Sequence, residues 1–263
     1  MGLENQVALV TGAATEIGCA YVKYLLQNKV KVLLCDVNVN KCQVILRKFL
    51  KEFPNSSLFS TKCDVTNEDE FENAFKTCIK YFGRLDIVIN SAGVFNNSTE
   101  RQWSDTVNIN YGGVVRGTLL AIKYMGIPNG GSGGTVIQTS SLMVFSDSYH
   151  CSPMYLSTKK YMMEFTKSFG KKHHFSLHGV KIITLCPEFT AVNWARPVYK
   201  NESMHQNGER VDEELEDSKT NQQNIEKQKL DNIGNALITI LDYGKTGETW
   251  IVEDNKPPRL IEY

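Results

Sequence analysis

ALVTGAATEIG, residues 8 to 18, joins an apolar run to a helical pattern and determines how the rest of the chain is interpreted. A strand that turns into a helix presents unpaired N–H groups and the positive end of a helix dipole to an anion. The loop therefore favours a pyrophosphate site, although an ordinary strand-to-helix turn is the alternative. Its central position holds Glu16, where a bare glycine would suit a pyrophosphate better.

Seven apolar runs typical of strands alternate with helical patterns along the chain, at 6–11, 31–36, 57–64, 86–91, 134–140, 180–187 and 248–254. Continuous apolar strands between amphipathic helices predict an α/β fold: a doubly wound (Rossmann) seven-stranded parallel sheet with helices on both faces. With 263 residues and 41% apolar content, we expect a single domain over 1–263. Ligands of such sheets bind at the carboxyl ends of the strands.

The charge balance gives no reason to expect a nucleic acid or a membrane surface as partner. Lys+Arg and Asp+Glu are both 29, so a small-molecule ligand fits better. The seven cysteines include no CxxC pair, which predicts buried free thiols, a reducing compartment and no metal site. No targeting segment and no stretch of about 20 apolar residues is visible, so we expect a cytoplasmic protein.

One segment, about 190–232, is dense in charged and amide residues and has few apolar anchors. It is typical of a solvated helix or a loose loop. Long insertions in compact domains are often lids, so a mobile lid over the site is a second interpretation, compatible with the first.

Polar and small residues follow several of the predicted strands. Asp36 ends the second strand about twenty residues after the loop, where a carboxylate accepts hydrogen bonds from ribose hydroxyls and repels a 2′-phosphate. This favours NAD over NADP, with a strand-end turn or a helix cap as the alternative for Asp36. The third and fourth strands end in Asp64, Val65, Asn90, Ala92 and Gly93.

The sequence YLSTK places Tyr155 and Lys159 one helical turn apart, so that they share a face. A nearby ammonium stabilises a phenolate and lowers the pKa of the phenol from about 10, which makes it a usable acid or base. Ser140 and Ser141 end the fifth strand, and Ser141 is placed to orient a substrate oxygen. The alternative is that Tyr155 is a semi-buried core residue and Lys159 a solvated one.

Taken together, ALVTGAATEIG, LLCDVN, CDVT, INSAGV, NINYGGV, YMGIPNGGSGGTVIQTSSL and YLSTK resemble the short-chain dehydrogenase/reductase family over essentially the full length of the chain. The resemblance is closest to its 15-hydroxyprostaglandin dehydrogenase type, including insect alcohol dehydrogenase-like relatives. It implies that Tyr155 is the acid/base, that Lys159 lowers the Tyr155 pKa and holds the nicotinamide ribose, that Ser141 binds the reacting oxygen, and that Asn110 holds a water in the proton relay.

The same resemblance implies an NAD site and a homodimer. The implied NAD-binding residues are Gly12, Thr15, Ile17, Gly18, Asp36, Asp64, Val65, Asn90, Ala92, Gly93, Tyr155, Lys159 and Pro187. The implied dimer surface is formed by the helices around 101–126 and 153–176.

Four positions depart from the family pattern. The middle loop glycine is Glu16, the glycine after the proline of the sixth strand is Glu188, and a nearby threonine is Val192. A carboxylate about 6 Å from a phosphate would cost roughly 0.7 to 3 kcal/mol, and a positive φ at Glu16 about 1–2 kcal/mol more. Alternatively, Glu16 turns outward at the helix N-terminus. Ser152 replaces the glutamine of prostaglandin dehydrogenases, which argues against prostaglandin specificity.

The residues expected to line the substrate pocket are mostly bulky and apolar: Ser141, Met143, Phe145, Tyr149, Phe189 and Trp194. Core or lid packing is the alternative for any one of them. We predict an NAD-dependent oxidoreductase that interconverts a hydrophobic secondary alcohol and its ketone, such as a lipid, steroid, isoprenoid or prostaglandin-like compound. The alternative is a non-enzymatic ligand-binding or scaffold protein whose cofactor site has decayed.

Overall fold

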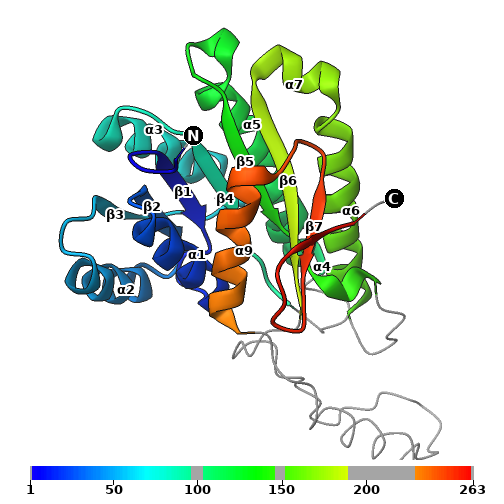
Figure 1. The fold of residues 1–263 in the computed structure, drawn as a ribbon, viewed down its shortest axis with the longest axis horizontal. Helices are drawn as coiled ribbons and strands as arrows, with labels where there is room; N and C mark the ends of the chain where they lie inside the picture. Colours follow the sequence, from blue (N-terminus) through cyan, green and yellow to red (C-terminus); the bar gives the residue numbers. More distant parts are fainter. Residues whose placement is uncertain (1, 96–102, 146–151, 189–228, 262–263) are drawn as a thin grey trace, which may run out of the picture.

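A computed structural model describes residues 2–95, 103–145, 152–188 and 229–261 (Figure 1). Within them, eight strands form one sheet in the order β3-β2-β1-β4-β5-β6-β7-β8. Their bounds are β1 Val7–Thr11, β2 Lys31–Asp36, β3 Leu58–Lys62, β4 Ile87–Asn90, β5 Gly134–Thr139, β6 Val180–Pro187, β7 Thr249–Val252 and β8 Arg259–Leu260. The first seven are parallel, which confirms the predicted sheet.

The eighth strand was not predicted. It has two residues, pairs antiparallel with β7, and is exposed at the edge of the sheet. A segment this short, directly after two prolines, carries no alternation that could distinguish it from a loop.

The helices cover both faces of the sheet, as predicted. Their bounds are α1 Glu16–Gln27, α2 Val39–Glu52, α3 Glu68–Phe82, α4 Trp103–Val107, a π-helix Asn108–Gly112, α5 Gly113–Met125, α6 Pro153–Phe169, α7 Lys172–His178 and α9 Leu230–Tyr243. One buried cluster lies between the sheet and α1, α2 and α9, and a second lies between the opposite face and α3 and α5. Neighbouring residues of β1 enter opposite clusters, as the pleat of a strand requires.

The helix starts follow the capping rules. Asn38 caps α2, Asn67 caps α3 and Ser152 caps α6, each by accepting a hydrogen bond from an N–H group three residues later. In α6, Pro153 takes the first helical position, where its missing N–H costs nothing. The cap and the proline fix where the helix that carries Tyr155 begins.

Two further expectations fall partly within the described residues. Of the segment at about 190–232 that is a candidate lid, 189–228 lie outside the described residues, and Leu230 begins α9. The six cysteines in the described part of the chain are free thiols, and five of them are buried. In the same residues no helix is long and apolar enough to cross a membrane.

The strand order reverses between β1 and β4. The chain passes from β1 outward to β2 and β3, then returns to β4 on the other side of β1. The loops after β1 and β4 therefore diverge at the carboxyl edge of the sheet, which is where open α/β sheets bind their ligands.

Candidate functional site

The loop between β1 and α1 is packed so closely that two of its positions accept only glycine. Gly12 has a φ of 65°, and a Cβ there would lie 2.8 Å from the Ala92 Cα at the end of β4. A Cβ at Gly18 would overlap the Gly12 carbonyl oxygen. The main chain of the loop thus lies bare between the ends of β1 and β4, as a phosphate-binding loop requires.

Thr15 holds the start of α1. Its Oγ accepts a hydrogen bond from the Gly18 N–H at 3.0 Å and donates one to the Gly12 carbonyl at 2.8 Å. Ile17 is the second residue of the helix, and N–H groups of the first turn have no acceptor within the helix. These groups point along the helix axis toward the space that an anion would take.

Glu16 is the first residue of α1 and half-buried. In the described residues, positive φ values outside glycine occur only at Asn5, Lys29, Asp254 and Asn255. The conformational penalty considered for Glu16 therefore does not apply. In the first turn, its carboxylate is stabilised by the helix dipole, so only charge repulsion would oppose an anionic ligand.

Asp36 ends β2 and is buried. Its Oδ2 accepts a hydrogen bond from the Ala14 N–H at 2.9 Å, and its Oδ1 accepts one from the Asn38 N–H at 2.8 Å. The carboxylate thus forms the strand-end turn and also ties β2 to the β1–α1 loop. Each oxygen keeps a further lone pair, so these bonds leave capacity for ribose hydroxyls.

A shallow depression of about 450 Å³ follows Asp36 and is lined by Val37, Asn38, Val39 and Asn40. Val37 is 59% exposed there, which offers an apolar surface next to the carboxylate. Beyond β3, Asp64 Oδ1 accepts hydrogen bonds from the N–H and the hydroxyl of Thr66, at 2.8 and 2.7 Å. Val65 fills the space in front of Gly113. This edge suits the adenosine half of a dinucleotide.

Asn90 points away from the loops. It is 3% exposed and donates to Gln138 Oε1 at 3.0 Å, while Gln138 donates to Thr118 Oγ at 2.7 Å. A Cβ at Gly117 would overlap the Asn90 side chain. The structure thus places this predicted cofactor residue in a buried network between β4, β5 and α5, where only its main chain is near the site.

Lys159 and Tyr155 are both 5% exposed, and the Lys159 Nζ lies 5.6 Å from the centre of the Tyr155 ring. The ammonium donates to the Thr139 carbonyl at the end of β5, at 2.7 Å. Burial lowers the pKa of Lys159 to about 8. Lys159 is buried, so the interpretation of Lys159 as a solvated side chain is wrong, and within the described residues it has no carboxylate partner.

Asn110 lies on the π-helix and is completely buried. Its Oδ1 accepts from the Val94 N–H at 2.8 Å, and its Nδ2 donates to the Val94 carbonyl at 2.9 Å and to Thr158 Oγ at 3.3 Å. Both amide hydrogens are thus used, and a water on Asn110 would have to bind a carbonyl oxygen. Gly93 leaves room here, because a Cβ there would lie 3.3 Å from Asn110 Oδ1 and 3.6 Å from Lys159 Nζ.

Three of the predicted substrate residues are described. Ser141 is buried and accepts a hydrogen bond from the Met143 N–H at 3.2 Å. Met143 and Phe145 lie on the 3-10 turn that follows, and Phe145 is 44% exposed. The remaining ones, Tyr149, Phe189 and Trp194, lie outside the described residues, as does Val192.

At the end of β6, Pro187 is buried and Glu188 turns toward β7. The Glu188 N–H donates to the Val252 carbonyl at 2.9 Å, and its Oε2 accepts from the Asp254 N–H at 2.7 Å. Asp254 has a φ of 51°, so this carboxylate supports a strained turn after β7. Glu188 therefore has a structural task beside the predicted cofactor site.

Sequence reasoning missed two residues that touch the site. The Phe95 ring meets the Tyr155 ring edge-on, with centroids 4.8 Å apart, and the Thr139 carbonyl holds Lys159. Thr139 was placed at a strand end but given no role, because a main-chain acceptor leaves no mark in the residue type. Phe95 follows INSAGV, and nothing in the sequence indicates that it reaches Tyr155.

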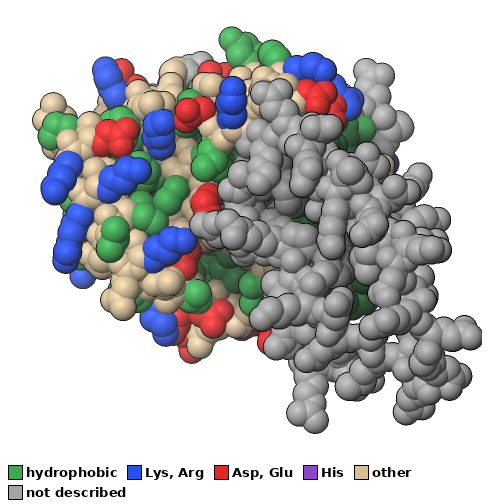
Figure 2. Space-filling view, turned by 90° about the horizontal axis from the view of Figure 1, so that it is seen from below, with side chains coloured by type: hydrophobic (Ala, Val, Ile, Leu, Met, Phe, Trp, Pro, Cys, Tyr) green, Lys and Arg blue, Asp and Glu red, His purple; other side chains and the backbone are tan. Residues whose placement is uncertain are grey.

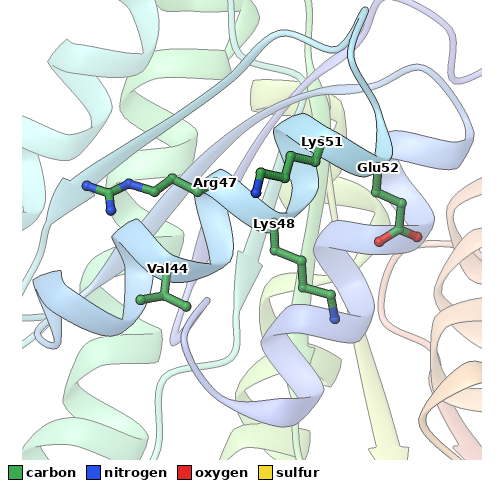
Figure 3. A pocket seen from close by; sticks show the side chains of 5 residues that line it. All are labelled: Val44, Arg47, Lys48, Lys51 and Glu52. Carbon is green, nitrogen blue, oxygen red and sulfur yellow. The ribbon is translucent and has the colours of Figure 1, made fainter.

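A groove of about 610 Å³ lies on α2, away from the predicted site residues, and is lined by Val44, Arg47, Lys48, Lys51 and Glu52 (Figure 3). Figure 2 shows the molecule from the side toward which β6 runs in Figure 1, with Lys and Arg side chains gathered on the left, where α2 lies. The groove shares no residue with the predicted cofactor and substrate sites.

Comparison with known proteins agrees with this geometry. The family model for short chain dehydrogenases matches residues 6–203. The 15-hydroxyprostaglandin dehydrogenase [NAD(+)] of Mus musculus is 36% identical over 209 residues, which cover 78% of this chain and 75% of the relative. Alcohol dehydrogenase 1 of Ceratitis cosyra is 25% identical over 252 residues, covering 95% and 93%. A short chain dehydrogenase/reductase from Burkholderia phymatum, solved in complex with NAD, superposes with a TM-score of 0.75 at 17% identity, covering 92% of this chain and 87% of that one.

Proposed function

Because this chain belongs to the short-chain dehydrogenase family, we propose that it is an NAD-dependent oxidoreductase that interconverts a hydrophobic secondary alcohol and its ketone. One observation carries the proposal. A buried ammonium, with no carboxylate partner in the described residues, lies beside the ring of a buried tyrosine at the carboxyl edge of the sheet. Holding such a charge in the interior is costly, which is typical of a functional site.

The residues of the predicted cofactor site fit NAD. Gly12 and Gly18 leave the main chain bare at the N-terminus of α1, where a pyrophosphate would bind. Asp36 would accept hydrogen bonds from the ribose hydroxyls of the adenosine half. When bound, NAD supplies the acceptor and donor of the hydride.

Tyr155 is the group that moves the proton. In the oxidation of an alcohol, its phenolate oxygen would take the hydroxyl proton while the carbon that bears the hydroxyl gives up hydride to the cofactor, and the reverse reaction returns the proton. Lys159 favours the phenolate by its positive charge. Of its three N–H groups, one binds the Thr139 carbonyl, which leaves two for the nicotinamide ribose.

Ser141 is suited to orient the reacting oxygen. Its Oγ accepts a hydrogen bond from the Met143 N–H, so its own hydrogen can be donated to the substrate. Asn110 fixes Val94 against Thr158, and thereby holds the segment after β4 against α6. We propose that its main-chain carbonyl holds the water of the proton relay.

The substrate we propose is a lipid, steroid or isoprenoid alcohol. The Phe95 ring contacts the Tyr155 ring, and the apolar Met143 and Phe145 lie on the turn directly after Ser141. We add Tyr149, Phe189 and Trp194 as pocket residues from the sequence. Ser152 accepts from the Tyr155 N–H at 3.5 Å as the cap of α6. Ser152 is shorter than the glutamine of prostaglandin dehydrogenases and lacks its carboxamide, which argues against a prostaglandin.

We further propose a homodimer through α5 and α6 in the cytoplasm. A row of aromatic rings lies along α6 and the π-helix, with Tyr111, Tyr161, Phe165 and Phe169 in successive ring contacts. Tyr161 is 64% exposed and Leu119 of α5 is 50% exposed, which leaves apolar area for a partner. The six free thiols fit a reducing compartment.

The test first measures NADH binding and then the turnover of alcohols. NADH fluorescence should change on titration with the protein, and a panel of secondary alcohols with NAD should then yield NADH. Tyr155→Phe should keep NADH binding and the folded state, since only a hydroxyl is removed, but lose turnover. If NADH fails to bind even at millimolar concentration, the non-enzymatic alternative replaces this proposal.

A further inference from the structure

We propose that Ser140, the residue before Ser141, is a positioning residue for this reaction, because it holds Lys159 of α6 against the end of β5. This inference rests on the proposed function. The Ser140 hydroxyl is directed to the main chain of Lys159, and the sequence alone gave Ser140 no role. Its part would be to keep the ammonium where the phenol needs it.

The contacts form a clamp between one residue of α6 and two consecutive residues of the sheet. The Ser140 hydroxyl donates to the Lys159 main-chain carbonyl at 2.9 Å, and the Lys159 ammonium donates to the Thr139 carbonyl at 2.7 Å. Ser140 itself is fixed, since its N–H donates to the Leu185 carbonyl of β6 at 2.8 Å. All three residues are at most 5% exposed, so these bonds are shielded from bulk solvent.

The clamp matters because the ammonium has little else to hold it. A lysine side chain is flexible along its four-carbon stem, and no carboxylate in the described residues attracts the charge of Lys159. Fixing the main chain of Lys159 fixes the start of that stem. The same helix carries Tyr155, so a shift of α6 would move both groups relative to Ser141 on the sheet. Displacements of this kind reduce catalysis strongly even when they are small.

A buried thiol completes the cluster without adding charge. Cys186 of β6 is fully buried, and burial raises its pKa to about 12, while the nearby Ser140 hydroxyl and the charge of Lys159 act in the opposite direction. The thiol is therefore neutral at physiological pH and offers Lys159 no counter-charge. It does give Ser140 a second neighbour in β6 besides Leu185.

The test compares Ser140→Ala with a matched control. Thr184 of β6 donates to Thr166 of α6 at 2.8 Å, and both are fully buried, so Thr184→Val also removes a buried hydroxyl bond between α6 and the sheet. Ser140→Ala should lower kcat by about tenfold or more. KM values should stay within about threefold. The pH at which kcat rises, which reports the ionisation of the Tyr155–Lys159 pair, should move to a higher value. Thr184→Val should lose similar thermal stability but keep kcat and the pH at which it rises.

A second readout does not need turnover. The rate at which acetic anhydride modifies Lys159, followed by mass spectrometry, should rise in Ser140→Ala and stay unchanged in Thr184→Val. Equal rates and an unchanged pH at which kcat rises would overturn the positioning role. If the alanine variant does not fold, Ser140→Cys keeps the size with a weaker donor and should show the same changes to a smaller degree. If the wild-type protein neither binds NADH nor turns over an alcohol, the proposed function fails, whereas the modification rates still test the clamp.

Discussion

The Nζ of Lys159 lies 5.6 Å from the centre of the Tyr155 ring, and both side chains are buried on the same face of α6. The spacing of four residues puts the two side chains side by side on the helix, and the sheet fixes the position of the ammonium. Thr139 supplies the one hydrogen-bond acceptor that this ammonium has in the described residues. The pair is thus built from a helix and a strand end that lie about twenty residues apart in the chain.

The burial of Lys159 should be visible in the pH dependence of stability. Its pKa is lowered from 10.5 to about 8 in the folded protein, so between these values the unfolded chain binds more protons. The free energy of unfolding should therefore rise with pH across this window. Relative to Lys159→Met, the wild type should gain up to about 3 kcal/mol. Urea unfolding of both proteins from pH 7 to 10.5 measures this difference.

A neighbour provides the control for this prediction. Lys160 is exposed on the same helix, and Lys160→Met should unfold with the pH dependence of the wild type. Parallel curves for wild type and Lys159→Met would show that the ammonium is not buried in solution. Lys159→Met should also lose turnover, because the phenolate loses its cation.

Glu16 should weaken NAD binding through its charge alone. Since Glu16 has helical φ, replacing it relieves no backbone strain, and Glu16→Gln removes the charge at nearly constant shape. At about 6 Å from a phosphate, the gain in affinity would lie between a few-fold and about a hundred-fold. NADH titrations at low and high salt measure it, and the gain should shrink with salt. Equal affinities at low salt would mean that the carboxylate faces away from the phosphates.

Glu188 should behave differently, because its carboxylate holds the Asp254 N–H. Glu188→Ala should lower the free energy of unfolding by about 1–3 kcal/mol, since a turn with positive φ loses its acceptor. NADH affinity should change little. Glu188→Gln keeps an acceptor oxygen and should restore most of the stability. A large rise in NADH affinity in either variant would place Glu188 among the groups that oppose the cofactor.

The fold could be predicted because its signal is repeated along the chain. Each of the seven parallel strands is a continuous apolar run, and each run from β1 to β6 ends in residues that belong to turns or sites. The two-residue β8 lacks such a pattern. The start of α9 at Leu230 is also hard to place from the sequence, since it lies among residues that are still polar.

The candidate site could be predicted only where the chemistry of a side chain itself indicates a role. Tyr155, Lys159 and Asp36 combine side-chain chemistry with a position at a strand or helix end, and the structure places Tyr155 and Lys159 together. The bond from Lys159 to the Thr139 carbonyl and the bond from the Asn90 side chain to Gln138 depend on three-dimensional packing. Neither can be predicted from the residue type. The direction of Glu188 likewise follows from the turn after β7, more than sixty residues away in the chain.

Gly18 should be the least replaceable residue of the loop. It is helical, so alanine would favour the helix by up to about 1 kcal/mol, but its Cβ would overlap the Gly12 carbonyl. The loop would have to move away from β4, which should cost about 1–3 kcal/mol of stability. The bare N–H groups would move with it, so NADH affinity should fall by about tenfold or more. Thermal unfolding and NADH titration measure the two effects. Gln27→Ala, at the exposed far end of α1, does not touch this loop and should leave NADH affinity intact. Unchanged affinity in Gly18→Ala would show that this loop does not hold the cofactor.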